Sequence, residues 1–184
     1  MKIEKTDFKD LLIIHHDVYL DDRGSFREVF RNDVLEETLN YKINFCQDNN
    51  VKSSYMVLRG LHYQQDPYAQ SKLIYVTNGK VLDIVVDIRK NSKTYGKYFS
   101  YALSSDLNKS LFIPKGFAHG YLSLSENSIV NYKVDSYYNK HYELGISYDD
   151  PYLNIDWGVI KEEIIFSDKD RNFSKFNWKQ NINK

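Results

Sequence analysis

The sequence predicts an all-β fold, a sandwich or small barrel of antiparallel strands. Short runs in which apolar and polar residues alternate dominate the middle of the chain, and turn-like clusters separate most of them at short intervals. The composition also favours strands, because 16 tyrosines and 10 phenylalanines stand against only 3 prolines. This spacing is typical of an all-β domain rather than of alternating strands and helices.

The clearest strands lie in residues 72–90, where two β-rich runs flank Asn78-Gly79, a two-residue signal for a hairpin. In the second run, alternation places Leu82, Ile84, Val86 and Ile88 on one face and Asp83, Val85 and Asp87 on the other. The other predicted strands are 11–19, 26–30, 43–49, 56–64, 97–103, 110–113, 119–124 and 128–138.

Helical patterns are sparse. Residues 32–41 carry Asp33 and Glu36 at the spacing of a capping box, with two leucines one turn apart. The stretch 158–173 favours a short helix followed by a polar loop. We therefore expect a few short helices beside the strands.

Length and charge limit the classes of function. No repeat, low-complexity tract or linker divides the 184 residues, so we expect one domain over 1–184. The 25 basic and 25 acidic residues cancel, which argues against nucleic acid or an anionic membrane as partner. The lone Cys46 forms no internal disulfide, and the start of the chain lacks the apolar core of a signal peptide. We expect a soluble, cytoplasmic protein.

The stretch "VLRGLHYQQD", residues 57–66, contains a single histidine, His62. In a strand its side chain would point the same way as Gly60 and Gln64. From these residues alone His62 is a structural histidine, a metal ligand or a catalytic base, and the structural reading is the commonest for a lone histidine in a strand.

The metal interpretation is weak. Metal-binding barrels of the cupin superfamily carry a His-x-His pair, a nearby glutamate and a later histidine, whereas position 64 here is a glutamine. The stretch "IPKGFAHG" supplies the later histidine, His119. Two histidines without a third ligand make a poor first-row metal site, so we expect no metal and no other cofactor.

Eight motifs occur in order over about residues 11–172: "DDRGSFREVF", "QDN", "VLRGLHYQ", "QSKLIYV", "VDIRKNSKTYG", "IPKGFAHGYLSLSE", "NYKVDSYY" and "ELGISYDDPYLNIDW". Through them the sequence resembles the nucleotide-sugar 3,5-epimerases typified by dTDP-4-dehydrorhamnose 3,5-epimerase. The resemblance implies a metal-free cupin jelly roll and a homodimer that shares strands between subunits. It implies nucleoside-diphosphate 4-keto-6-deoxy sugars as substrates, inverted at C3 and C5, in the synthesis of surface polysaccharide.

The resemblance also implies the catalytic residues. Removing a proton next to a ketone requires a base on one face, a proton donor on the other and a positive group at the enolate oxygen. His62 matches the family's base, Tyr132 its proton donor and Lys72 its enolate-stabilising lysine. Asp170, in "SDKD", matches the carboxylate that orients the base, although the proline that follows in the family is absent.

Substrate-binding residues are assigned by the same motif matching. Arg59, Lys72 and His119 would face the sugar and diphosphate, and Tyr138 would stack on the base. His119 has a second interpretation, as a residue that stabilises the mouth of the barrel.

Two further groups complete the expected binding site. Gln47 and Asn49 would bind sugar or nucleotide edges, or simply pair in a turn at the end of a strand. Arg23, Phe26 and Glu28 would complete the nucleotide pocket from the partner subunit, although Arg23-Gly24 also fits a plain turn.

Departures from the family pattern leave alternatives open. Asn50-Val51 stands where the family often has His-Ser, and Trp157-Gly158 where it has Trp-Pro. One alternative is an epimerase of a single centre, C3 or C5, or of another sugar such as a GDP-linked heptose. An alternative from another class is a non-catalytic cupin that binds a sugar nucleotide. Uptake of solvent deuterium at both, one or neither carbon separates these hypotheses.

Overall fold

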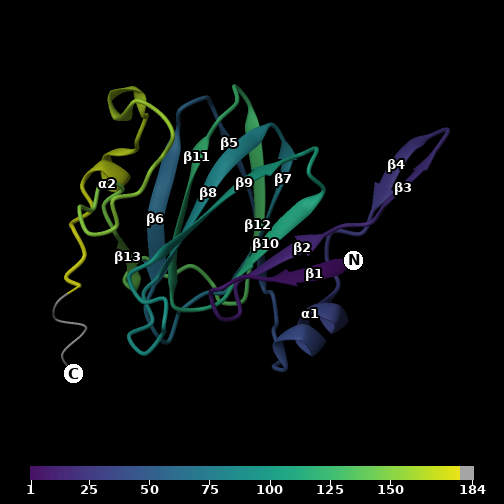
Figure 1. The fold of residues 1–184 in the computed structure, drawn as a ribbon, viewed down its shortest axis with the longest axis horizontal. Coiled ribbons are helices and arrows are strands. Elements are labelled where there is room, and N and C mark those ends of the chain that lie inside the picture. Colours follow the sequence, from purple (N-terminus) through teal and green to yellow (C-terminus); the bar gives the residue numbers. More distant parts are fainter. Residues whose placement is uncertain (179–184) are drawn as a thin grey trace.

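The computed structural model describes residues 1–178 as two antiparallel sheets packed face to face, with short helices at the periphery (Figure 1). The six-stranded sheet has the order β1 (Lys2–Lys5), β2 (Leu12–His15), β10 (Lys109–Ile113), β7 (Lys72–Asn78), β12 (Ser128–Val134) and β5 (Gln47–Ser53). The five-stranded sheet has the order β13 (Glu143–Gly145), β6 (Leu58–Gln64), β11 (Phe117–Ser123), β8 (Lys80–Asp87) and β9 (Tyr98–Ser104). The all-β prediction is confirmed. The predicted single domain ends at residue 184, and 179–184 lie outside the described residues.

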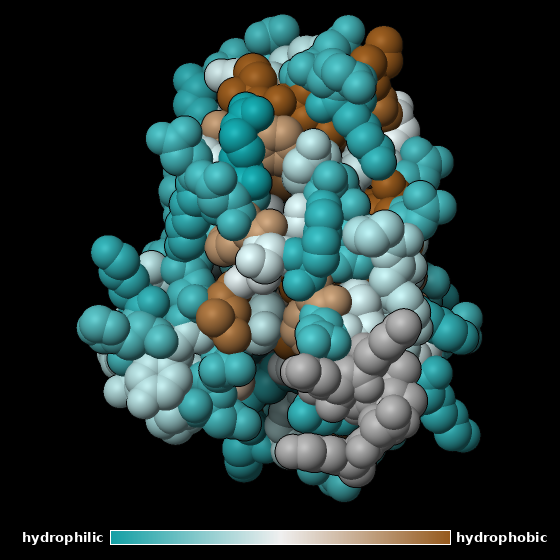
Figure 2. All heavy atoms as spheres, turned by 90° about the vertical axis from the view of Figure 1, so that its left-hand side faces the viewer, coloured by the Kyte–Doolittle hydropathy of each residue, from teal (hydrophilic) through white to brown (hydrophobic). Residues whose placement is uncertain are grey.

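Three apolar clusters hold these layers together. The first lies between the sheets and includes Ile74, Val85 and Leu111, all fully buried. The second covers the outer face of the five-stranded sheet with the segment that follows β13, and the third packs α1 (Asn32–Leu39) against the six-stranded sheet. Figure 2 shows the side that carries the C-terminal segment, largely hydrophilic, with apolar groups gathered at its upper end. The five-stranded sheet is therefore covered on both faces, which explains why β8 is buried along almost its whole length.

The hairpin predicted at Asn78-Gly79 is wrong. The two flanking strands belong to different sheets: β7 pairs with β10 and β12, whereas β8 pairs with β11 and β9. Gly79 has φ of 75° and turns the chain from one sheet into the other. The same glycine signal serves a turn within a sheet and a turn between sheets, and only the long-range pairing distinguishes them. The alternation predicted for the second strand is confirmed, because Ile84 and Val86 pack in the outer cluster and Val85 packs between the sheets.

The helices differ from the predicted caps. The N-cap of α1 is Arg31, which makes no capping hydrogen bond from its side chain, and Asp33 lies inside the helix. Glu36 instead accepts from the backbone N–H of Ile43 and from Lys42, beyond the other end of the helix. The capping-box prediction is therefore wrong. The predicted C-terminal helix is present as a 3-10 turn, η1 (Lys161–Glu163), and a four-residue helix, α2 (Asp168–Arg171).

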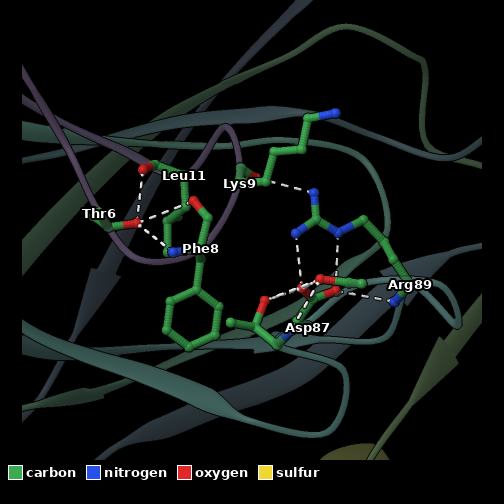
Figure 3. Close-up of polar contacts among 8 residues, drawn as sticks. Thr6, Phe8, Lys9, Leu11, Asp87 and Arg89 are labelled. Carbon is green, nitrogen blue, oxygen red and sulfur yellow. Dashed lines mark hydrogen bonds and ion pairs between the residues drawn. The ribbon is translucent and has the colours of Figure 1, made fainter.

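The motif "VDIRKNSKTYG" has a structural role. The buried Asp87 accepts hydrogen bonds from the Arg89 guanidinium, with Nε–Oδ1 at 2.9 Å and Nη2–Oδ2 at 2.7 Å, and from Ser92 and Thr94. Arg89 also donates to the carbonyl of Lys9, at 3.0 Å (Figure 3). These contacts fasten the N-terminal turn to the end of β8. Hydrogen bonds to Arg89, Ser92 and Thr94 hold the pKa of Asp87 below its usual range, although burial acts in the opposite direction.

A two-stranded hairpin, β3 (Val18–Asp21) and β4 (Gly24–Arg27), projects away from the sheets (Figure 1). It carries apolar side chains into solvent, with Tyr19, Leu20 and Phe26 exposed by 61%, 79% and 67%. At its base Arg27 donates to Asn108 Oδ1, at 2.7 Å, and fixes the hairpin to the body. Among residues 1–178, no helix is long and apolar enough to cross a membrane.

Candidate active site

A cavity of about 350 Å³ opens between the two sheets. Its wall takes residues from β6, β7, β11, β12, β13 and the α2 segment, so it joins parts of the chain that are far apart in sequence. The predicted catalytic residues all line it, as do three of the predicted binding residues: His62, Lys72, Tyr132, Asp170, Arg59, His119 and Tyr138.

A β-bulge in β6 allows both Arg59 and His62 to reach the cavity. Three residues apart, they would point to opposite faces of a regular strand. On the partner strand β11, however, His119 pairs with His62 and Tyr121 pairs with Arg59, so β6 holds one extra residue between them. The extra residue falls at Gly60, which has φ of 129° and whose Cβ, if present, would lie 2.5 Å from the Cα of Gly120. The glycine of "RGLH" is thus required by the close approach of the two strands.

His62 lies between two carboxylates. Its Nδ1 is 2.8 Å from Glu143 Oε1 on β13, and its Nε2 is 2.9 Å from Asp170 Oδ1 on α2. The second contact has the distance of an ion pair without the alignment of a hydrogen bond. Burial acts to lower the pKa of His62, but Asp170 and Glu143 outweigh it and raise the pKa above its ordinary value. This arrangement favours the protonated ring.

The two carboxylates are held differently. Asp170 is 4% exposed and its Oδ2 accepts from the backbone N–H of Gly60, at 3.3 Å. Glu143 accepts from side chains at the mouth of the cavity, Lys169 and the Tyr138 hydroxyl. Burial opposes ionisation of Glu143, but its contacts with His62, Lys169 and Tyr138 lower its pKa to about 2. Glu143 thus has partners that are about half exposed, whereas Asp170 is anchored by the backbone.

A second histidine–carboxylate pair lies beside the first. His119 Nε2 is 2.9 Å from Oδ2 of Asp83, a fully buried carboxylate on β8. Burial lowers the pKa of His119, although Asp83 acts in the opposite direction, and the charges of Lys72 and His62 lower it further. A neutral ring that donates to Asp83 keeps Nδ1 as an acceptor. The pKa of His62 is therefore raised, whereas that of the neighbouring His119 is lowered.

Lys72 and Tyr132 come from the six-stranded sheet and face the His62 strand across the cavity. Burial lowers the pKa of Lys72 to about 8, while Asp83 and Glu143 act against that change. Burial raises the pKa of Tyr132, so its phenol keeps its proton. Base candidate and donor candidate thus come from opposite walls.

The remaining predicted residues lie elsewhere. Gln47 and Asn49 do not line the cavity; both lie in strand β5, and their side chains pair with each other at 2.8 Å within that strand rather than in a turn. Arg23 pairs with Asp21 on the projecting hairpin. Phe26 and Glu28 line a separate hollow of about 360 Å³ beside that hairpin. The cavity of this chain therefore receives none of the three residues assigned to the partner subunit.

Several wall residues were not predicted from the sequence. Glu143 is the first residue of the motif "ELGISYDDPYLNIDW", and Lys169 belongs to "SDKD". Asp83, which lies behind the wall, belongs to a predicted strand, but the sequence does not indicate its pairing with His119. In the described part of the chain, no three His, Cys, Asp or Glu side chains are grouped as a metal site. The expected absence of a metal stays a prediction; activity lost with a chelator and restored by added metal would contradict it.

Comparison with known proteins gives a consistent result. A family model for dTDP-4-dehydrorhamnose 3,5-epimerase matches residues 5–177. The dTDP-4-dehydrorhamnose 3,5-epimerase of Shigella flexneri is 46% identical over 176 residues, 96% of each chain.

Solved structures agree in fold. The epimerase of the same name from Elizabethkingia anophelis is 42% identical, with a TM-score of 0.93 over 97% of this chain and 98% of that one. The dTDP-6-deoxy-D-glucose-3,5-epimerase of Legionella pneumophila, solved in complex with dTDP-4-keto-L-rhamnose, is 41% identical, with a TM-score of 0.87 over 92% of this chain and 89% of that one. This chain is an isomerase with a cupin-like jelly roll, and it belongs to the dTDP-4-dehydrorhamnose 3,5-epimerase family.

Proposed function

We propose that this protein inverts C3 and C5 of dTDP-4-dehydro-6-deoxy-glucose and releases dTDP-4-dehydrorhamnose. His62 removes the proton from the carbon next to the C4 ketone, and the electron pair of the broken C–H bond moves into an enolate. Tyr132 then returns a proton to the same carbon from the opposite face. The observation that carries the proposal is the placement of His62 and Tyr132 on opposite walls of one cavity.

His62 becomes a base when one of its two carboxylates withdraws. Glu143 is the one that moves, because its other partners, Lys169 and Tyr138, are about half exposed, whereas Asp170 is held by the backbone of Gly60. Asp170 stays on Nε2, orients the ring and stabilises the imidazolium that forms. Nδ1 then faces the substrate. Removing one carboxylate also lowers the pKa of His62 toward the working range of a base.

Lys72 stabilises the enolate. Its side chain lines the cavity, where a positive charge acts on a developing oxyanion more strongly than in water. Arg59 serves the diphosphate, since a guanidinium fork matches phosphate oxygens. His119 presents a neutral ring to the sugar, and Gln47 and Asn49 bind the nucleotide edge from the adjoining strand. Tyr138 stacks on the base once Glu143 has left its hydroxyl.

The functional unit in this proposal is a homodimer of single-domain chains in the cytoplasm. The hairpin β3–β4 supports the dimer, because it carries large apolar side chains into solvent and its predicted binding residues lie away from the cavity of the same chain. In the dimer, Arg23, Phe26 and Glu28 of each hairpin complete the nucleotide pocket of the other subunit. Covering the hairpin also removes its apolar surface from water.

The test of the proposed function is the reaction of the wild type in D₂O with dTDP-4-dehydro-6-deoxy-glucose, followed by NMR. We expect deuterium at both C3 and C5 and the inverted product. Label at one carbon would establish the single-centre alternative. No label with this sugar or with other 4-keto nucleotide sugars would contradict epimerisation and leave a binding protein. Thermal shifts with dTDP and GDP, measured in parallel, report which nucleotide the protein prefers.

A further inference from the structure

The segment that follows α2 lies against the β6–β13 side of the molecule and is fastened there (Figure 1). The backbone N–H of Ser147 donates to the carbonyl of Ser174, at 3.1 Å. Asp150, 1% exposed, accepts from the backbone N–H of Phe176 at 2.9 Å and from the indole of Trp178 at 3.2 Å. These contacts hold the chain just beyond Phe173, which is the first aromatic residue after α2.

Phe173 contacts the histidine ring directly. The two rings meet edge to face, with centroids 5.1 Å apart and planes at 85°. The tip of the phenyl ring stands on Gly145, where an added Cβ would lie 2.4 Å from three ring atoms. Gly145 is the residue of β13 that pairs with His62. The absent side chain at Gly145 thus makes the space in which Phe173 reaches His62.

We propose that Phe173 is a positioning residue, whose ring, seated on Gly145, holds the His62 imidazole in the orientation in which Nε2 meets Asp170. The inference rests on the proposed role of His62 as base. Rotation about the last side-chain torsion of histidine is broad, and once Glu143 withdraws Asp170 restrains the ring at one nitrogen only. The edge-to-face contact with the Phe173 ring supplies the second restraint on the imidazole.

The first test compares Phe173→Ala with Phe176→Ala. Phe176 lies on the same segment and packs on Tyr63 and Trp178 instead of His62, so it controls for loosening of the segment. We expect Phe173→Ala to lower kcat by roughly 10- to 100-fold with KM changed less than about threefold, because misplacing a catalytic group slows the chemical step. Phe176→Ala should lower the Tm and leave kcat within about twofold. Equal losses of kcat in the two variants would overturn the proposal.

A second readout does not depend on turnover. The groups that act on the ring are Asp170 from α2, Glu143 from β13, Lys72 from β7 and His119 from β11. A ring freed from its orientation loses its close approach to the carboxylates. We expect this loss to outweigh the relief of burial, so the midpoint of the NMR titration of His62 should fall in Phe173→Ala. It should stay at the wild-type value in Phe176→Ala. An unchanged midpoint in Phe173→Ala would contradict the proposal even if kcat falls.

Gly145→Ala tests the same space from the other side. Its Cβ meets the Phe173 ring, and the backbone there has no positive φ that would itself be strained. Gly145→Ala should therefore lower kcat and the His62 midpoint as Phe173→Ala does, and the double variant should be no worse than Phe173→Ala alone. Additive losses would mean that the two residues act separately. A wild type without deuterium exchange would instead refute the proposed function, while the titrations would still decide whether Phe173 orients the ring.

Discussion

His62 and His119 face each other across one pair of strands, yet their surroundings drive their pKa values in opposite directions. His62 contacts two carboxylates and its pKa is raised. His119 contacts one, Asp83, in a fully buried setting where the cost of charging the ring dominates, and its pKa is lowered. The charge of His62 also lowers the pKa of His119. The number of partners and the degree of burial, rather than the residue type, set these opposite shifts, which fit the proposed roles of His62 in proton transfer and of His119 as a neutral hydrogen-bonding ring.

Replacing either histidine should show the largest difference between His62 and His119, in the loss of kcat. We expect His62→Asn to lower kcat by roughly 10³- to 10⁴-fold, because it removes the general base. His119→Asn should cost about tenfold, mainly in KM, because it removes a hydrogen bond to the sugar. Steady-state kinetics measures both, with dTDP-induced thermal shifts as the control for binding. Similar losses in kcat for both variants would erase the distinction.

Tyr132→Phe separates removal of the proton from its return. The base remains, so deuterium should still enter the substrate with retained configuration, while formation of the inverted product falls roughly 10²-fold or more through loss of the acid. NMR of recovered substrate and product in D₂O measures the two rates. If deuterium exchange and inversion fell equally, Tyr132 would be needed for removal of the proton and not only for its return.

Arg23→Ala tests whether the second subunit completes the site. A lost charge-assisted contact to the nucleotide should weaken dTDP binding by about tenfold or more. The decisive experiment refolds Arg23→Ala together with His62→Asn to give heterodimers. In each heterodimer, one of the two sites combines the intact His62 of one chain with the intact Arg23 of the other. Activity at low substrate should rise above that of either variant alone. No rise would place Arg23 outside the neighbouring site.

The pH profile should show the smallest but most informative changes. In the wild type, kcat/KM should fall on the acid side as His62 protonates, at a pKa above the ordinary 6.5, and on the alkaline side near pH 8, where Lys72 loses its charge. Glu143→Gln should move the acid limb to lower pH, because one carboxylate that raises the pKa of His62 is gone. It should also move the alkaline limb to lower pH, because Glu143 raises the pKa of Lys72.

Asp83→Asn is the matched control for that profile. Asp83 pairs with His119 and raises the pKa of Lys72, but it does not contact His62. It should therefore move the alkaline limb and leave the acid limb in place. An acid limb that shifts in Asp83→Asn and not in Glu143→Gln would assign that limb to His119.

Local patterns predicted most of the strands, though not β1 or β13, and the family resemblance carried by the ordered motifs predicted most of the residues that meet in the cavity. They did not predict what depends on pairing between distant segments. Glu143 reaches His62 only because the three-residue strand β13 pairs with β6, and no periodicity marks so short a strand. Arg59 and His62 share a wall because of a bulge that only the register with β11 shows. Asn78-Gly79 looked like a hairpin because a two-residue turn does not encode which sheet follows it.

The central claim is that His62 and His119 hold their protons differently, and their NMR titrations in the protein without ligand test it directly. With resonances assigned through His62→Asn and His119→Asn, the account predicts that the midpoint of His62 lies above 6.5 and that of His119 below it. The reverse order, or two midpoints that coincide, would contradict the assignment of His62 as the base held by carboxylates and His119 as its neutral neighbour.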